Sequence, residues 1–149
     1  MARAWASGES LERALGYLIT IIIIVSLVLI AAGKIRIAVV EGRSMEPTMH
    51  TGDLVFLRSE PPEKIKPGDV VVYKTDGRYI IHRVINVYIF KGNYCYIIKG
   101  DNNPVPDPGF PACGSRGIPY SAIIGVVYSV DGSVVKIPYL GGISVMVKG

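Results

Sequence analysis

The sequence predicts a mainly β fold: a hairpin-built, antiparallel β domain attached to a single N-terminal transmembrane helix. Residues 14–33 contain no charged side chain, and twenty helical residues rise about 30 Å, enough to cross a hydrocarbon core. After this segment, short runs of β-branched and aromatic residues alternate with clusters of Gly, Pro, Asn and Asp, the pattern of strands joined by turns. Helical periodicity is absent from this part, so no further long helix is expected.

The apolar segment divides the 149-residue chain into a cytoplasmic N-terminal segment (1–13), a transmembrane helix (14–33) and a β-rich domain (34–149). A buried helix of a soluble protein rarely runs this long without a polar face, and a cleavable signal has a shorter apolar core. We therefore favour a retained anchor. Two basic residues precede the segment and two follow it, so the charges do not orient it. The net charge of +4 fits attraction to anionic lipids, and no basic stripe with interleaved aromatic residues indicates nucleic-acid binding.

The β-rich part is punctuated by turn signals. Asp76-Gly77 and Asp131-Gly132 are dipeptides typical of tight hairpin turns. Residues 100–117 form a long loop rich in Gly, Pro, Asn and Asp, and a loop of this length in a compact domain is usually functional or disordered. The strands expected between these turns cover residues 35–40, 54–58, 70–74, 78–87, 94–99, 121–130, 134–137 and 143–147.

Residues 41–53 hold a serine, Ser44, on a bent segment dense in turn formers between two apolar runs. A serine hydroxyl is a weak nucleophile at neutral pH and needs a base beside it. His82 lies within an expected strand and can serve as that base near neutral pH. Asp101 and Asp107 in the long loop are the candidate acids that would orient an imidazole.

Four motifs together carry a resemblance to a known family. They are Ser-Met-Glu-Pro-Thr-Met at 44–49, Gly-Asp-Val-Val-Val-Tyr at 68–73, Ile-Ile-His-Arg-Val-Ile at 80–85, and Gly-Asp-Asn-Asn at 100–103 with Asp107 following. In this order, behind an apolar anchor, they resemble type I signal peptidases, which are membrane-bound serine proteases. A histidine at position 82, where the bacterial branch carries a lysine, is similar to the endoplasmic-reticulum and archaeal branch.

The resemblance implies a membrane-bound serine endopeptidase that removes signal peptides from exported preproteins by acyl-enzyme chemistry. It implies that Ser44 is the nucleophile and His82 the base. We expect Asp107, mounted between two prolines, to orient the base, and Asp101 to act as a second, supporting acid that shapes the loop.

The resemblance also implies that substrate binds as an added, extended strand. We expect apolar walls from Met45, Ile80 and Val84 to leave shallow pockets that accept only small side chains beside the cut. The backbone N–H of Ser44 is the expected oxyanion donor. Position 42, where many relatives have a serine, is Gly42, which leaves the second donor unassigned.

The expected partners are signal peptides of preproteins and the lipid membrane, with partner subunits or export machinery left open, and with no cofactor, metal or nucleic acid. The resemblance places the β domain on the extracytoplasmic side of the cell membrane or the endoplasmic-reticulum membrane. Cys95 and Cys113 have no metal-site spacing. In an exported domain they form either a disulfide or two buried thiols, and the sequence favours neither.

Two other functions share this sequence pattern. A catalytically inactive, membrane-tethered β domain that binds or scaffolds partners would keep the anchor and the hairpins but tolerate loss of Ser44 or His82. A self-cleaving regulator related in fold would use a lysine base and a DNA-binding region, and the sequence shows neither. An assay of preprotein cleavage separates the active enzyme from the inactive module.

Overall fold

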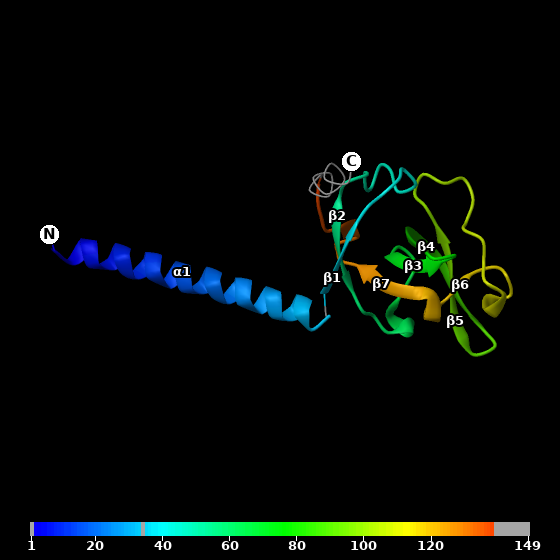
Figure 1. Ribbon diagram of the computed structural model, residues 1–149, viewed down its shortest axis with the longest axis horizontal. Helices are drawn as coiled ribbons and strands as arrows, with labels where there is room; N and C mark the ends of the chain where they lie inside the picture. The colour runs from blue at the N-terminus through cyan, green and yellow to red at the C-terminus, as the bar shows by residue number, and fades with distance from the viewer. Residues whose placement is uncertain (1, 34, 139–149) are drawn as a thin grey trace. The chain divides into compact units, whose positions relative to one another are not determined.

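The structure, a computed structural model, describes residues 2–33 and 35–138, and the chain divides into two units, Met1–Ile35 and Arg36–Gly149 (Figure 1). The first unit is the helix α1 (Ala2–Ala31). Its segment Ser10–Ala31 has a mean hydropathy of 2.8 and is long and apolar enough to cross a membrane. The hydroxyls of Thr20 and Ser26 donate to carbonyls one turn earlier, so neither adds an unpaired polar group to the apolar segment.

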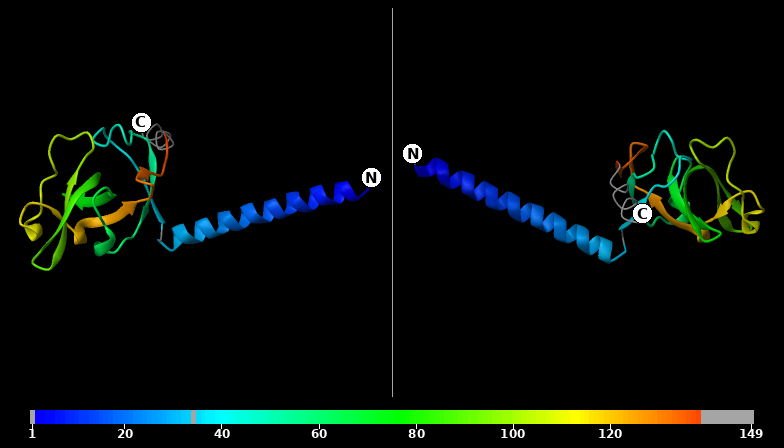
Figure 2. Two further views of the ribbon diagram at one scale, coloured as in Figure 1. Left: turned by 180° about the vertical axis from the view of Figure 1, so that it is seen from behind. Right: turned by 45° about the horizontal axis from the view of Figure 1, so that its top comes forward.

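The second unit is built on one antiparallel sheet, which curves round on itself (Figure 2). Its strands follow the order β1-β2-β7-β3-β4-β5-β6, with β10 added beside β2, and β8 and β9 form a separate hairpin. The strands are β1 (Ile35–Val39), β2 (Leu54–Arg58), β3 (Val70–Thr75), β4 (Arg78–Phe90), β5 (Asn93–Lys99), β6 (Ile118–Pro119), β7 (Ile123–Val127), β8 (Ser129–Val130), β9 (Ser133–Val134) and β10 (Lys136–Ile137). Short 3-10 turns lie at Pro62–Lys64, Pro111–Cys113 and Tyr120–Ala122.

The hairpin of β3 and β4 sets the register of the centre of the sheet. Asp76 and Gly77 both have positive φ, 47° and 76°, the conformation of the tight turn that the sequence predicts here. The turn pairs Tyr73 with Ile80 and Val71 with His82. Because register is fixed by the turn, each β4 side chain from Arg78 to Arg83 is committed to one face of the sheet.

The mainly β fold with one apolar N-terminal helix is confirmed, and most expected strands are present. The strand at 54–58 has the expected bounds, whereas β4 runs three residues beyond the expected end at 87. The expected strand 121–130 is wrong in extent, because a 3-10 turn precedes β7 and β8 is separate. The loop 100–117 contains a 3-10 turn, and β6 directly after it was not expected. The expected strand 143–147 lies outside the described residues.

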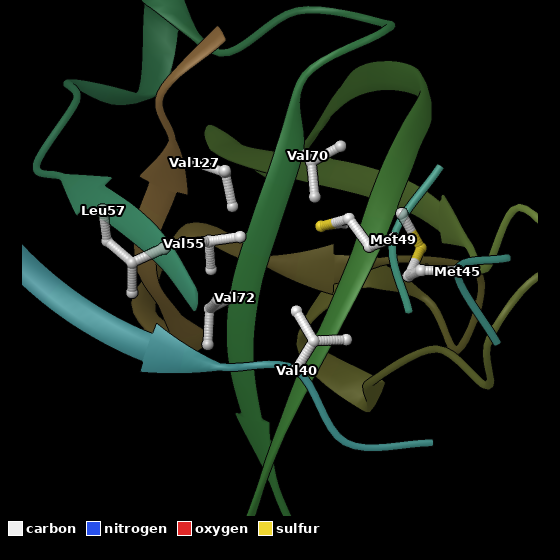
Figure 3. Packing of buried hydrophobic residues seen from close by; sticks show 8 residues of the cluster. All are labelled: Val40, Met45, Met49, Val55, Leu57, Val70, Val72 and Val127. Carbon is white, nitrogen blue, oxygen red and sulfur yellow. The ribbon is translucent and has the colours of Figure 1, made fainter. Parts of the chain in front are cut away.

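Two hydrophobic clusters pack on the two faces of β3. Val70 and Val72 point into the first cluster, and Val71 and Tyr73 into the second, as alternation along a strand requires. This explains why β3 reads as an unbroken apolar run: both of its faces are buried. The first cluster is completed by Val40, Met45, Met49, Val55, Leu57 and Val127 (Figure 3). The second is completed by Ile65, Val84, Tyr96, Ile98, Ile118 and Val126.

Candidate active site

The segment that carries Ser44 packs against the first cluster and is hydrogen-bonded to the loop after β5. Met45 and Met49 are 1% and 0% exposed, so they fix the segment to the core. The N–H of Asn102 donates to the carbonyl oxygen of Ser44 over 2.8 Å. A Cβ atom at position 100 would lie 2.6 Å from the same oxygen, so glycine allows this close approach. Ser44 is thereby held half-buried at a defined position.

A second set of contacts joins the far end of this segment to β10. The buried carboxylate of Asp53 accepts a hydrogen bond from the N–H of His50 over 2.9 Å. It also forms an ion pair with Lys136 Nζ over 2.6 Å. Lys136 Nζ also donates to the carbonyl of Thr48. His50 therefore lies in the loop that supports Ser44, and its backbone, rather than its ring, has the structural contact.

His82 connects the nucleophile to an acid. Its Nε2 lies 2.9 Å from Ser44 Oγ, and its Nδ1 lies 2.6 Å from Asp107 Oδ2. The side chains of His82 and Asp107 are 8% and 9% exposed. A carboxylate only accepts hydrogen bonds, so Nδ1 carries the hydrogen and the lone pair of Nε2 faces the serine hydroxyl. The structure brings these three predicted residues together in the order nucleophile, base, acid.

Asp107 reaches His82 because its loop is pinned to the sheet. The N–H of Asp107 donates to the carbonyl of Ile98 on β5 over 2.8 Å. The loop is closed further on by a disulfide between Cys95 on β5 and Cys113, with the two Cα atoms 5.8 Å apart. Both ends of the loop are therefore attached to one strand, which limits where the carboxylate can lie.

Sequence reasoning missed a second donor to the acid. The hydroxyl of Tyr73 donates to Asp107 Oδ2 over 2.9 Å, the same oxygen that faces His82. Burial, followed by the negative charge of Asp107, raises the pKa of Tyr73, so the phenol stays protonated as a donor. The hairpin turn at Asp76-Gly77 indicates only that Tyr73 lies two residues from Val71, the partner of His82, on the same face of β3. The contact with Asp107 depends on where the long loop lies.

Asp101 makes a different set of contacts, none of them with His82. Its carboxylate accepts hydrogen bonds from Arg83 Nε over 2.8 Å and from Arg83 Nη2 over 2.7 Å. It accepts a third from the Thr48 hydroxyl over 2.5 Å. Burial alone would raise the pKa of this carboxyl, but the hydrogen bonds from Arg83 and Thr48 outweigh it, so its pKa lies below the ordinary value. Asp101 thus ties together the Ser44 segment, β4 and the long loop.

A groove of about 980 Å³ opens beside Ser44 and His82. Its walls come mainly from β1 and from the first five residues of β4, and it is lined by Arg36, Ile37, Ala38, Val39, Glu41, Ser44, Leu57, Val72, Gly77, Arg78, Tyr79, Ile80, Ile81, His82 and Ile124. Within the described residues β1 pairs only with β2, and β4 pairs with β5 only from Arg83 onward. The groove is therefore bordered by two strand edges with unpaired backbone groups.

One of the three expected substrate contacts lines this groove and two do not. Ile80 lines it, but Met45 and Val84 are each 1% exposed and belong to the hydrophobic clusters. Met45 and Val84 therefore do not line the groove. Met45 turns inward to anchor its loop, and Val84 lies where β4 gains β5 as a neighbour and is covered by the second cluster.

The expected oxyanion donor, the N–H of Ser44, donates to no protein acceptor within residues 35–138. Gly42 contributes no side-chain donor, and the second donor stays unassigned. Over the same part of the chain, no three His, Cys, Asp or Glu side chains gather as a metal site would require.

Comparison with known proteins points to one group of enzymes. Residues 5–127 match the family model described as peptidase S24-like. The human "signal peptidase complex catalytic subunit SEC11C" is 33% identical over 125 residues, covering 82% of this chain and 62% of the relative. The SEC11 catalytic subunit of Candida dubliniensis is 31% identical over 126 residues, covering 83% of this chain and 72% of the relative. The chain thus spans about 62% of the length of the SEC11C relatives.

Proposed function

Because the chain belongs to the family of S24-like peptidases, we propose that it is a membrane-anchored serine endopeptidase that removes signal peptides from exported preproteins. The observation that carries the proposal is the hydrogen-bonded series Ser44–His82–Asp107, whose serine and histidine line a groove of about 980 Å³. The SEC11 relatives are named catalytic subunits of a signal peptidase complex, which supports the substrate class.

The proposed reaction follows from the geometry at Ser44. His82 Nε2, 2.9 Å from the serine oxygen, takes its proton as Oγ attacks the scissile carbonyl carbon. The Ser44 N–H stabilises the oxyanion of the tetrahedral intermediate. His82 then gives the proton to the departing amine, which leaves an acyl-enzyme on Ser44. Water, deprotonated by the same imidazole, releases the acyl group and regenerates the hydroxyl.

Asp107 acts in this scheme through His82. Its charge holds the ring with Nε2 toward Ser44 and stabilises the imidazolium that forms during attack. Asp101 has a structural role, because its carboxylate is saturated by Arg83 and Thr48. In this scheme Asp107 supports the base, and Asp101 holds the loops in place.

The peptide would lie extended in the groove and hydrogen-bond to the free edges of β1 and β4. The wall residues Ile37, Val39 and Ile80 are apolar and lie beside the reacting groups, which favours small apolar side chains near the cut. We propose that α1 crosses the membrane and that the β domain lies on its extracytoplasmic side, in the cell membrane or the endoplasmic-reticulum membrane. Partner subunits are part of this proposal, because the relatives are named as subunits of a complex.

The test is cleavage of a preprotein by the full chain in detergent, followed by mass spectrometry of the two products. Ser44→Ala should abolish processing without changing the melting temperature, because a half-buried serine contributes little to the core. Ser133→Ala, at the exposed first position of β9, is the matched control and should cleave normally. Processing by Ser44→Ala at the wild-type rate would remove the serine from the mechanism.

An inactive binding module is the other interpretation of the same fold, and nothing in the described residues favours it. If the wild-type chain bound preproteins without cleaving them, that interpretation would replace ours. Native size in detergent, with and without candidate partners, tests the subunit proposal separately.

A further inference from the structure

The acid of the proposed site receives two hydrogen bonds, and the second comes from a residue outside the Ser44–His82–Asp107 series. We propose that Tyr73 is a positioning residue that holds the Asp107 carboxylate toward His82 and reduces its negative charge, and so sets the pH above which His82 acts as a base. This inference rests on the proposed function of Ser44 and His82.

The first step of the argument is that both donors share one oxygen. Tyr73 Oη lies 2.9 Å from Asp107 Oδ2, and His82 Nδ1 lies 2.6 Å from the same atom. Tyr73 is 2% exposed, so water does not compete with the phenol. With a donor on each side of Oδ2, the carboxylate cannot turn away from His82 without breaking the bond to Tyr73.

The second step is that the scaffold leaves Tyr73 little freedom. It lies on β3, between β4 and β7, and its ring is packed in the second cluster with Val84, Ile98 and Val126. The hydroxyl therefore projects from a fixed ring. A buried phenol needs a hydrogen-bond acceptor, and the acceptor of this one is the acid of the site.

The third step concerns charge. A hydrogen bond from a neutral donor draws charge away from a carboxylate and weakens its hold on a neighbouring cation. With Tyr73 in place, Asp107 stabilises the protonated form of His82 less than a bare carboxylate would. Removing the hydroxyl should leave His82 protonated, and hence inactive as a base, up to a higher pH.

Other charged groups near the site are engaged elsewhere or stay unchanged by such a variant. Arg83 and Asp101 pair with each other, and Lys99 Nζ donates to the carbonyls of Gly100 and Asn103. Three further charged side chains line the groove: Arg36, Glu41 and Arg78. Within the described residues, none of these six donates to the Asp107 carboxylate, so their fields act equally on wild type and variant.

The experiment measures kcat and KM for preprotein cleavage as a function of pH, using the full chain in detergent. Tyr73→Phe removes the hydroxyl and keeps the ring. We expect kcat at the plateau to fall about tenfold with KM unchanged, and the acid limb of the kcat/KM profile to move up by about half a pH unit. An unmoved acid limb, or one moved to lower pH, would overturn the proposal.

Tyr96→Phe is the matched control. Tyr96 is 0% exposed and belongs to the same cluster, but its hydroxyl donates to the carbonyl of Pro62, away from the site. Both variants lose one buried hydrogen bond, so both should melt at lower temperature. Only Tyr73→Phe should shift the acid limb. An equal shift in Tyr96→Phe would show that the effect is one of general stability.

A double-mutant cycle, with kcat expressed per folded enzyme, keeps the test decisive if Tyr73→Phe is poorly stable. In an Asp107→Ala background no carboxylate remains, so adding Tyr73→Phe should lower kcat no further. A further tenfold loss would contradict action through Asp107.

If wild type cleaves and Tyr73→Phe matches it at every pH, this inference fails while the proposed function stands. If Ser44→Ala cleaves as well as wild type, the proposed function fails, and this inference with it.

Discussion

Substitution of Gly100 by alanine tests whether the loop after β5 holds the nucleophile in place. A Cβ atom there would lie 2.6 Å from the carbonyl oxygen of Ser44, whereas carbon and oxygen atoms ordinarily approach to about 3.3 Å. One of the two backbones must move by roughly 0.7 Å, and the same movement strains the hydrogen bond from Asn102 to Ser44. Gly100 has no positive φ, so the effect comes from this contact and not from backbone conformation.

The structure gives the size of this effect. Overpacking of this kind costs about 1–3 kcal/mol of stability. A displacement approaching 1 Å in a reacting group costs up to about a hundredfold in rate. We therefore expect Gly100→Ala to lower kcat by about 10- to 100-fold and to reduce the melting temperature by several degrees. KM should change less, because the groove is lined by β1 and β4 rather than by this loop.

The assay is cleavage of a preprotein by the full chain, with thermal melting measured on the same samples. Gly16→Ala is the control, because a Cβ atom there meets nothing within 4 Å. It should match wild type in both measurements. If Gly100→Ala is folded and retains full kcat, the close contact does not position Ser44, and the reasoning is refuted.

Three further predictions concern the acids and the disulfide. Asp107→Asn should lower kcat by about 10³- to 10⁴-fold with little change in melting temperature, because His82 loses its orienting charge; near-normal kinetics would contradict this. Asp101→Asn should act on stability, and because the pKa of Asp101 is lowered in the folded state, its ion pair stabilises fully above about pH 4 and is lost as pH falls further. The difference in melting temperature between Asp101→Asn and wild type should therefore shrink in acid, and a difference independent of pH would exclude the ion pair. Replacing Cys95 and Cys113 by serine should cost about 3 kcal/mol by the chain-entropy model, and alkylation of thiols in unreduced wild type would show the bond to be absent.

Local chemistry predicted the central hairpin, whereas the roles expected of Ser44 and His82 came from the resemblance to type I signal peptidases. Asp76-Gly77 accepts positive φ at both positions, and that turn fixes which residues of β3 and β4 face each other. The long loop was recognisable from its composition. Asp107 was distinguished by the prolines on both sides, which restrict its backbone. These signals lie within a few residues of the feature they predict.

The groove lining and the second donor depend on contacts between distant segments, which sequence pattern does not specify. Alternation correctly places Val84 on the same face as His82, but it does not reveal that β5 and the second cluster cover that end of β4. Tyr73 reads as one more apolar residue of a buried strand until its hydroxyl is seen beside Asp107. Its role requires the loop 100–117 to be placed against the sheet.

Within residues 35–138, one edge of β1 and the first part of one edge of β4 are unpaired, which exposes the protein to self-association as well as offering a place for substrate. An exposed strand edge accepts any extended chain, including a segment of a second copy of the same protein. The five-residue length of β1 and the charged side chains of Arg36 and Arg78 at the groove limit such self-association. A substrate peptide competes for the same backbone groups, so turnover should protect the enzyme from aggregation. Stored without substrate at high concentration, the protein presents these edges to other copies of itself, at the same groove that the proposed substrate would occupy.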